Sequence, residues 1–251
     1  MTAPIIPGAE PWSADGTNGH GALVLHGFTG NCNSMRGLAE AFHAAGYSVE
    51  LPLLPGHGTA IEDMLVTGWA DWSAAAEEAY QRLAARVDKV VVAGLSMGGS
   101  LTCWLAVHHP EIAGIVCVNP ATQVNEDVRA LVAGMVEAGE TVMPGIGSDI
   151  ADPDATESAY EGAPLAPLLS MFAAADEFGA ELAKIECPLL LFTSPQDHVV
   201  PPTDSDHLAA SVSGAVERVT CERSYHVATL DYDKGLIEEG AVAFADKVTA
   251  S

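Results

Sequence analysis

The sequence has few basic side chains: 10 Lys and Arg residues stand against 34 Asp and Glu residues, which gives a formal net charge of −24. A charge of this sign repels nucleic acid phosphates and anionic lipid headgroups. We therefore expect no nucleic acid partner, and a substrate that is neutral or cationic. A hydrated acidic surface explains most of this charge without a specific acidic site.

Long apolar runs are also absent. Nowhere do about 18 apolar residues follow one another, and the opening MTAPIIPGAEPWSADG has neither a basic segment nor a long apolar one. The sequence thus predicts no integral membrane segment and no signal peptide, and a cytoplasmic location. The five cysteines are widely spaced and form no C-x-x-C pair, so we expect reduced buried thiols and neither a metal site nor a cofactor.

What the chain does have is a regular alternation of short apolar runs and helical patterns. Runs such as GALVLHG, YSVELPLL and CPLLLFTS are typical of strands, and stretches such as WADWSAAAEEAYQRLAARV are typical of amphipathic helices. This alternation predicts βαβ units, and hence an α/β fold with a mostly parallel central sheet flanked by helices.

The alternation stops in one internal segment, residues 121–184, where helical pieces are interrupted by GMVEAGE, MPGIGSD and GAPLAPLL. We interpret this segment as a helical cap (lid) inserted over the ends of the strands. The core domain would then consist of residues 1–120 and 185–251. Apolar side chains of such a cap pack onto the core and also face a ligand.

The motif G-x-S-x-G occurs in VVVAGLSMGGS, where Ser96 lies between Gly94 and Gly98. A strand pattern precedes it and a helix pattern follows, which is the context that a nucleophilic serine on a strained strand-to-helix turn requires. Glycines flank the serine because larger side chains would collide in so sharp a turn. Ser96 is therefore the candidate nucleophile.

A serine nucleophile needs a histidine base, and the base needs a carboxylate that holds its orientation. In this arrangement the acid and then the base follow the serine, on loops after C-terminal strands. The loop after CPLLLF offers Asp197 and the loop after AVERVTCE offers His226. His26 and His57, in the turns LHGFTG and PGHGTA, are better placed to tie loops together.

Asp197 is followed directly by His198 in TSPQDHVVPP. Successive side chains of an extended segment point to opposite sides, so the two neighbours do not easily share one site. We expect Asp197 to pair with His226, and His198 only to shape the loop.

Ester chemistry also requires donors for the oxygen that becomes negative in the tetrahedral intermediate. The backbone N–H of Met97, which follows Ser96, is one candidate. The other is the backbone N–H of Phe28 in HGFTG, in the loop after the first core strand.

These motifs together resemble a known family. LHGFTG, LPLLPGHGT, GLSMGG, DHVVPP and SYHVATLDYD are similar to those of the α/β-hydrolase superfamily, and within it to bacterial monoacylglycerol lipases and related carboxylesterases. The resemblance covers nearly the whole chain after about residue 20. It implies a serine esterase of lipid metabolism with the triad Ser96, Asp197 and His226 and no cofactor.

The resemblance also implies a small amphiphilic ester as substrate, above all monoacylglycerol cleaved to fatty acid and glycerol, with transient contact between the cap and a lipid interface. In the cap, Glu157 corresponds to a glutamate that contacts glycerol, and Ile146 is added as a candidate substrate contact. Arg223 stands where these lipases carry a small polar residue, which bears on headgroup selectivity. Two alternatives stay open: a broad short-chain carboxylesterase, and a hydrolase-derived receptor that binds a small ligand with little turnover.

Overall fold

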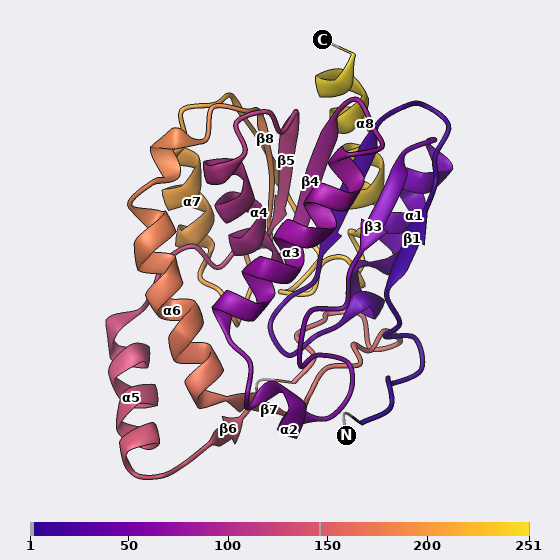
Figure 1. The fold of residues 1–251 in the computed structure, drawn as a ribbon. Helices are drawn as coiled ribbons and strands as arrows, with labels where there is room; N and C mark the ends of the chain where they lie inside the picture. Colours follow the sequence, from indigo (N-terminus) through magenta and orange to yellow (C-terminus); the bar gives the residue numbers. More distant parts are fainter. Residues whose placement is uncertain (1–2, 146, 251) are drawn as a thin grey trace.

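The computed structural model describes residues 3–145 and 147–250, and its main feature is one twisted sheet (Figure 1). In this part of the chain the sheet has seven strands in the order β1-β3-β2-β4-β5-β8-β9. β1 pairs antiparallel with β3, and the other neighbours pair in parallel. The strands are β1 (Trp12–Ala14), β2 (Gly21–Leu25), β3 (Ser48–Leu51), β4 (Val90–Leu95), β5 (Gly114–Val118), β8 (Leu189–Thr193) and β9 (Val216–Thr220).

Helices cover both faces of this sheet (Figure 1). α1 (Arg36–Ala44) packs against α8 (Lys234–Thr249) on one face, and α3 (Trp69–Ala84) packs against α4 (Met97–His108) on the other. The core is completed by η1 (Cys32–Met35), α2 (Ile61–Met64) and α7 (Pro202–Ser211). The expected α/β architecture, with a mostly parallel sheet between helices, is confirmed.

The burial of the central strands explains why they appear in the sequence as continuous apolar runs. β2, β4 and β5 are buried at every position, as expected for parallel strands covered on both faces. Their side chains alternate between two apolar layers. Leu23, Val92 and Ile115 face the layer with α3 and α4, whereas Val24 and Val116 face the layer with α1 and α8.

Three short strands were not predicted from the sequence. β1 has three residues, too few to show an alternation of period two, and it is recognised only by its register with β3. The segment 121–184, expected to consist of interrupted helical pieces, also contains a two-stranded antiparallel sheet of β6 (Val142–Pro144) and β7 (Gly162–Pro164). These strands carry proline and glycine and are three residues long, so no sequence signal of a strand survives.

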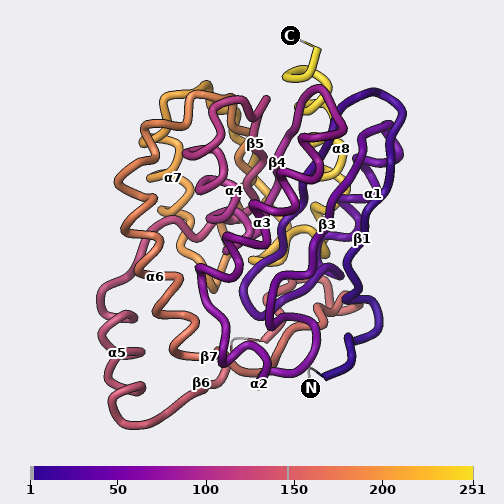
Figure 2. Tube along the Cα trace, viewed as in Figure 1, coloured from indigo at the N-terminus to yellow at the C-terminus, as the bar shows by residue number. Residues whose placement is uncertain are grey.

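Two helices and a short 3₁₀ turn flank this small sheet, and the described residues between β6 and β7 form no helix. α5 (Glu126–Glu137) and α6 (Leu165–Gly179) lie side by side at one edge of the molecule, followed by η2 (Leu182–Lys184) (Figures 1 and 2). α6 also packs on α3 and α4. Within the described ranges, no helix combines the length and the apolar character that crossing a membrane requires.

Candidate active site

Ser96 occupies the turn between β4 and α4. Its backbone has φ 55 and ψ −119, a left-handed conformation that is rare for a residue other than glycine. The turn is held by a hydrogen bond from the Ser96 N–H to the carbonyl of Val118 (3.0 Å) and by one from the Ser100 N–H to the carbonyl of Ser96 (3.1 Å). Neighbouring segments therefore hold the strained serine in place from both sides.

The two glycines of the motif are required by contact. A Cβ atom on Gly94 would lie 2.1 Å from the carbonyl oxygen of Gly98, and one on Gly98 would lie 2.1 Å from that of Leu25. Both contacts are with backbone, which cannot swing aside as a flexible side chain does. The serine thus sits on a turn that only glycine neighbours permit.

Asp197 and His226 come together from the loops after β8 and β9. Asp197 Oδ2 lies 2.7 Å from His226 Nδ1, and the two side chains are 2% and 8% exposed. Asp197 Oδ1 accepts two further hydrogen bonds, from the N–H groups of Val199 and Val200 at 2.8 Å each. A carboxylate at Nδ1 fixes the proton on that nitrogen and leaves Nε2 free to act as a base.

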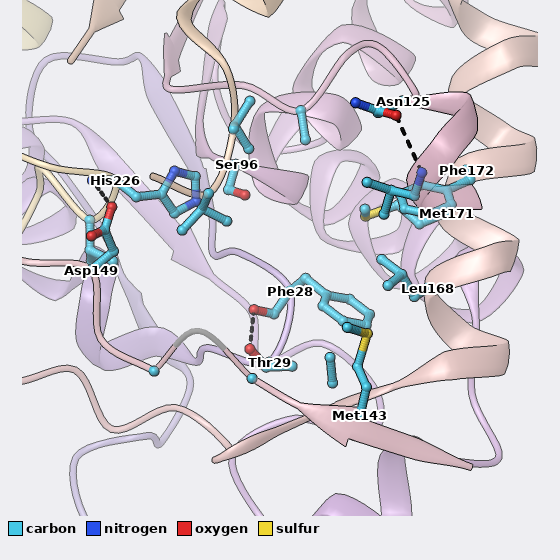
Figure 3. A pocket seen from close by; sticks show the side chains of 18 of the residues that line it. Phe28, Thr29, Ser96, Asn125, Met143, Asp149, Leu168, Met171, Phe172 and His226 are labelled. Atoms are coloured by element: carbon cyan, nitrogen blue, oxygen red, sulfur yellow. Dashed lines mark hydrogen bonds between the residues drawn. The ribbon is translucent and has the colours of Figure 1, made fainter. Parts of the chain in front are cut away.

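The Ser96 hydroxyl and the His226 ring line one cavity of about 370 Å³, which Figure 3 shows from close by. Much of its wall is apolar and comes from residues 121–184, and Met143 and Leu168 lie near Phe28 on the side of the cavity away from His226. The predicted contact Ile146 lies outside the described residues.

The two candidate donors lie on either side of Ser96. Met97 is the first residue of α4, and the first N–H groups of a helix have no acceptor within it. Phe28 lies in the loop after β2, where the Cβ position of the preceding Gly27 is 3.4 Å from Ser96 Cβ. Their role as an oxyanion hole stays a prediction.

His26 and His57 are buried next to the loop that contains Phe28. His26 donates from Nδ1 to the carbonyl of Gly27 (3.0 Å) and accepts at Nε2 from the N–H of Leu54 (3.1 Å), which defines a neutral ring. Its ring centroid lies 4.9 Å from that of His57. Complete burial lowers the pKa of His26 to about 4, and burial also lowers the pKa of His57 well below its ordinary value. Both rings connect the loops LHGFTG and PGHGTA.

Glu157 brings a carboxyl group to the lining of the cavity. Its Oε1 lies 2.8 Å from the position that a Cβ atom of Gly30 would occupy, so a side chain at residue 30 would displace the end of the flexible Glu157 side chain. Burial raises the pKa of Glu157, and the nearby His226 and a hydrogen bond from Ser34 oppose this shift. Arg223, in contrast, points elsewhere: its guanidinium lies 4.7 Å from the centre of the Tyr232 ring, and it is absent from the described lining of the cavity.

His198 turns away from Asp197 and binds a different carboxylate. Its Nδ1 lies 2.8 Å from Asp149 Oδ1, and its side chain is 57% exposed. Sequence reasoning missed Asp149, because nothing in GSDIADP distinguishes it from the second aspartate of that stretch. It also missed Asn119, whose side chain reaches the loops of both Asp197 and His226; the sequence shows only an asparagine directly after the apolar run IVCV.

The fold and the strained serine turn define a class of protein. The model of the α/β hydrolase fold family matches residues 23–149, and the chain belongs to this family. A curated relative, the thermostable monoacylglycerol lipase of Bacillus sp. (strain H-257), is 48% identical over 97% of both chains. The carboxylesterase of Bacillus subtilis (strain 168) is 24% identical over 90% of this chain and 92% of its own.

Solved structures of similar fold include lipolytic enzymes. A structure from work on LipS and LipT, two metagenome-derived lipolytic enzymes, superposes with a TM-score of 0.93 at 40% identity and covers 97% of this chain and 100% of its own. The monoacylglycerol lipase of Paleococcus ferrophilus superposes with a TM-score of 0.73 at 20% identity over 96% of this chain and all of its own, a likeness of fold alone.

Proposed function

We propose that this protein is a serine hydrolase that cleaves monoacylglycerol to a fatty acid and glycerol through an acyl-enzyme. The observation that carries the proposal is the contact of 2.7 Å between Asp197 and His226, because the ring of His226 lines the same mostly apolar cavity as Ser96. A nucleophile on a strained turn, an oriented base and an apolar cavity are the parts that hydrolysis of a lipid ester requires.

In the first half of the reaction, His226 Nε2 takes the proton of the Ser96 hydroxyl as its oxygen attacks the ester carbonyl. The backbone N–H groups of Phe28 and Met97 stabilise the negative oxygen of the tetrahedral intermediate, and each donor is worth about 3 kcal/mol. The intermediate collapses, the C–O bond to glycerol breaks, and His226 gives its proton to the departing alkoxide. Ser96 is then an acyl ester.

In the second half, His226 takes a proton from water, which attacks the acyl carbonyl. The new tetrahedral intermediate expels the Ser96 oxygen, and this oxygen regains its proton from His226. Asp197 keeps its charge throughout and stabilises the protonated ring. The cycle consumes one water and needs no electron donor or acceptor.

The substrate class follows from the cavity walls. Met143, Leu168, Met171 and Phe172 offer an apolar surface for an acyl chain, and Glu157 offers an acceptor for glycerol hydroxyls. The net charge of −24 disfavours an anionic thioester such as acyl-CoA. The name of the relative that is 48% identical supports the same substrate.

The cap also presents apolar side chains outward. Val128 and Leu131 of α5 are 40% and 58% exposed. Brief contact of this face with a lipid interface would bring the insoluble substrate to the cavity. This contact belongs to the proposal.

The test compares initial rates of the purified protein on monoacylglycerol, triacylglycerol, acyl-CoA and nitrophenyl esters of graded chain length, with Ser96→Ala as control. We expect the highest kcat/KM on monoacylglycerol and no turnover in Ser96→Ala. Full activity of Ser96→Ala would refute the assignment, and a preference for the shortest nitrophenyl esters would favour a broad carboxylesterase. Labelling by a fluorophosphonate without turnover of any ester would identify a receptor.

A further inference from the structure

Asp149 is a cap residue that binds the loops of both the candidate acid and the candidate base. Its Oδ2 accepts hydrogen bonds from the backbone N–H groups of His198 and His226, at 3.1 Å each. Its Oδ1 lies 2.8 Å from Nδ1 of His198. Figure 3 shows the Asp149 carboxylate beside His226 on the wall of the cavity. One side chain from the segment between β6 and β7 thus joins two loops of the core.

The two backbone N–H groups that bind Asp149 belong to the two loops that carry the candidate acid and the candidate base. One belongs to His226 itself and the other to the residue that follows Asp197, and both point at the same carboxylate oxygen. Asp197 Oδ1 is held by its own loop, through Val199 and Val200. The distance between the two loops therefore depends on groups that bridge them. The 2.7 Å contact between Asp197 and His226 in turn depends on that distance.

The carboxylate is well placed to act as such a bridge. Its side chain is 10% exposed, so water competes little for its oxygens, and hydrogen bonds to an ionised acceptor are the strong ones. The segment around it is anchored as well. The Val227 N–H donates to the Asp149 carbonyl at 3.1 Å, and Asp231 accepts from the N–H groups of Ala151 and Asp152 at 2.7 and 3.0 Å.

We propose that Asp149 is a positioning residue for the hydrolytic reaction: it holds the backbone of His226 and the loop of Asp197 at the separation that the acid–base pair needs. The cap then takes part in catalysis as well as in substrate binding. This inference rests on the proposed function, because it assigns a role to Asp149 through His226. Asp149 acts on the base and makes no bond to the substrate.

The experiment uses Asp149→Asn and Asp149→Ala in the full-length chain, assayed on a short-chain nitrophenyl ester that makes little use of the cap. Active sites are counted with a fluorophosphonate, so that kcat refers to competent molecules only. We expect kcat per labelled site to fall about 10- to 100-fold in Asp149→Ala, with KM changed by less than about twofold, because misplacement of a reacting group lowers the rate of the chemical step. Asn keeps one acceptor oxygen and should lie between the wild type and Ala.

A merely structural role predicts a different pattern: fewer labelled sites and a lower Tm, but unchanged kcat per labelled site. That pattern overturns the proposal. Asp154→Asn, an exposed carboxylate of the same cap segment, is the matched control and should behave as wild type. His198→Ala should keep most of the rate, since both backbone N–H bonds to Asp149 remain; an equal loss in His198→Ala would also overturn the proposal.

The outcome for the proposed function is read separately. If the wild type turns over esters and Ser96→Ala does not, the serine hydrolase assignment stands whatever the Asp149 variants do. If Ser96→Ala is as active as the wild type, the proposed function fails, and the inference about Asp149 fails with it.

Discussion

The side-chain amide of Asn119 donates a hydrogen bond of 2.8 Å to the backbone carbonyl of His226. The same group reaches the loop of Asp197, because its Oδ1 accepts from the N–H of Ser194 at 2.8 Å and its Nδ2 donates to Ser194 Oγ at 3.0 Å. Asn119 directly follows Val118, whose carbonyl accepts from the N–H of Ser96. Asn119, which is 3% exposed and has a left-handed φ of 43, thus connects the loops of Asp197 and His226, and its neighbour Val118 binds the turn of Ser96.

Replacement of Asn119 should impair both folding and rate. Asn119→Ala leaves the N–H of Ser194 and the carbonyl of His226 without these partners, so we expect the free energy of unfolding to fall by about 3 kcal/mol. We expect kcat to fall about tenfold as the base loop loosens. Denaturant unfolding and steady-state kinetics measure the two effects. Asn119→Gly should be less destabilised than Ala by about 1 kcal/mol, because glycine tolerates the left-handed backbone; an Ala variant as stable as the wild type would contradict this prediction.

The neighbours of the TSPQDHVVPP loop should respond asymmetrically. His226→Ala removes the proposed base, and we expect kcat to fall by about 10⁴ or more. His198→Ala removes a ring that is 57% exposed and leaves the backbone N–H bonds of residues 198 and 226 to Asp149 in place, so kcat should stay within about threefold of wild type. Single-turnover and steady-state rates on one nitrophenyl ester decide the matter. A reversed order of the two losses would show that the base has been misassigned.

Glu157→Gln should affect substrates according to their hydroxyl groups. Because Glu157 is proposed to accept hydrogen bonds from glycerol, loss of its charge should raise KM for monoacylglycerol about tenfold. A nitrophenyl ester, which has no such hydroxyl groups, should be turned over as by the wild type. Glu161→Gln, an exposed carboxylate near β7, serves as the matched control. Equal changes on both substrates would assign Glu157 a role in the fold rather than in recognition of glycerol.

Acid should destabilise the protein through His26. Burial lowers its pKa from 6.5 to about 4. As the pH falls below 6.5, His26 therefore becomes protonated in the unfolded chain while it stays neutral in the folded chain. Stability is therefore fully present above pH 6.5 and is lost as the pH falls toward about 4, by about 3 kcal/mol for this group.

The measurement is denaturant unfolding of the wild type and His26→Gln between pH 7 and pH 4. Glutamine can still donate to Gly27 and accept from Leu54, the two partners of the His26 ring, but it does not titrate. Carboxylates titrate equally in both proteins. As the pH falls, the free energy of unfolding of the wild type should therefore decrease by about 3 kcal/mol more than that of His26→Gln. If the free energies of unfolding of the two proteins change in parallel with pH, His26 accepts a proton in the folded protein and this prediction is wrong.

Much of the fold could be predicted because its signals are local. The buried parallel strands leave apolar runs such as those of β4 and β5, and the helices between them show an amphipathic pattern. β1, β6 and β7 could not be predicted, since strands of three residues are defined by their partners across the sheet rather than by their own side chains. The cap boundaries at residues 121 and 184 remain a prediction.

The candidate triad was predictable for a different reason. Ser96 lies in a turn whose glycines are required by contact, and Asp197 and His226 each follow a strand near the end of the chain. Asp149 and Asn119 had no comparable signal. Their side chains bind backbone groups of loops far along the chain, and backbone N–H and C=O groups are the same at every residue.

The sequence by itself therefore determined the alternation of strands and helices and the glycine-flanked turn of Ser96, because each depends on neighbours within a few positions. It also placed the candidate acid and the candidate base each on a loop after a strand. Only the tertiary structure decided that Asp197 meets His226 across 29 positions, that His198 pairs with Asp149, and that a cap residue joins the two loops. These contacts depend on how separate loops meet at one edge of the sheet, a relation that no local pattern of side chains encodes.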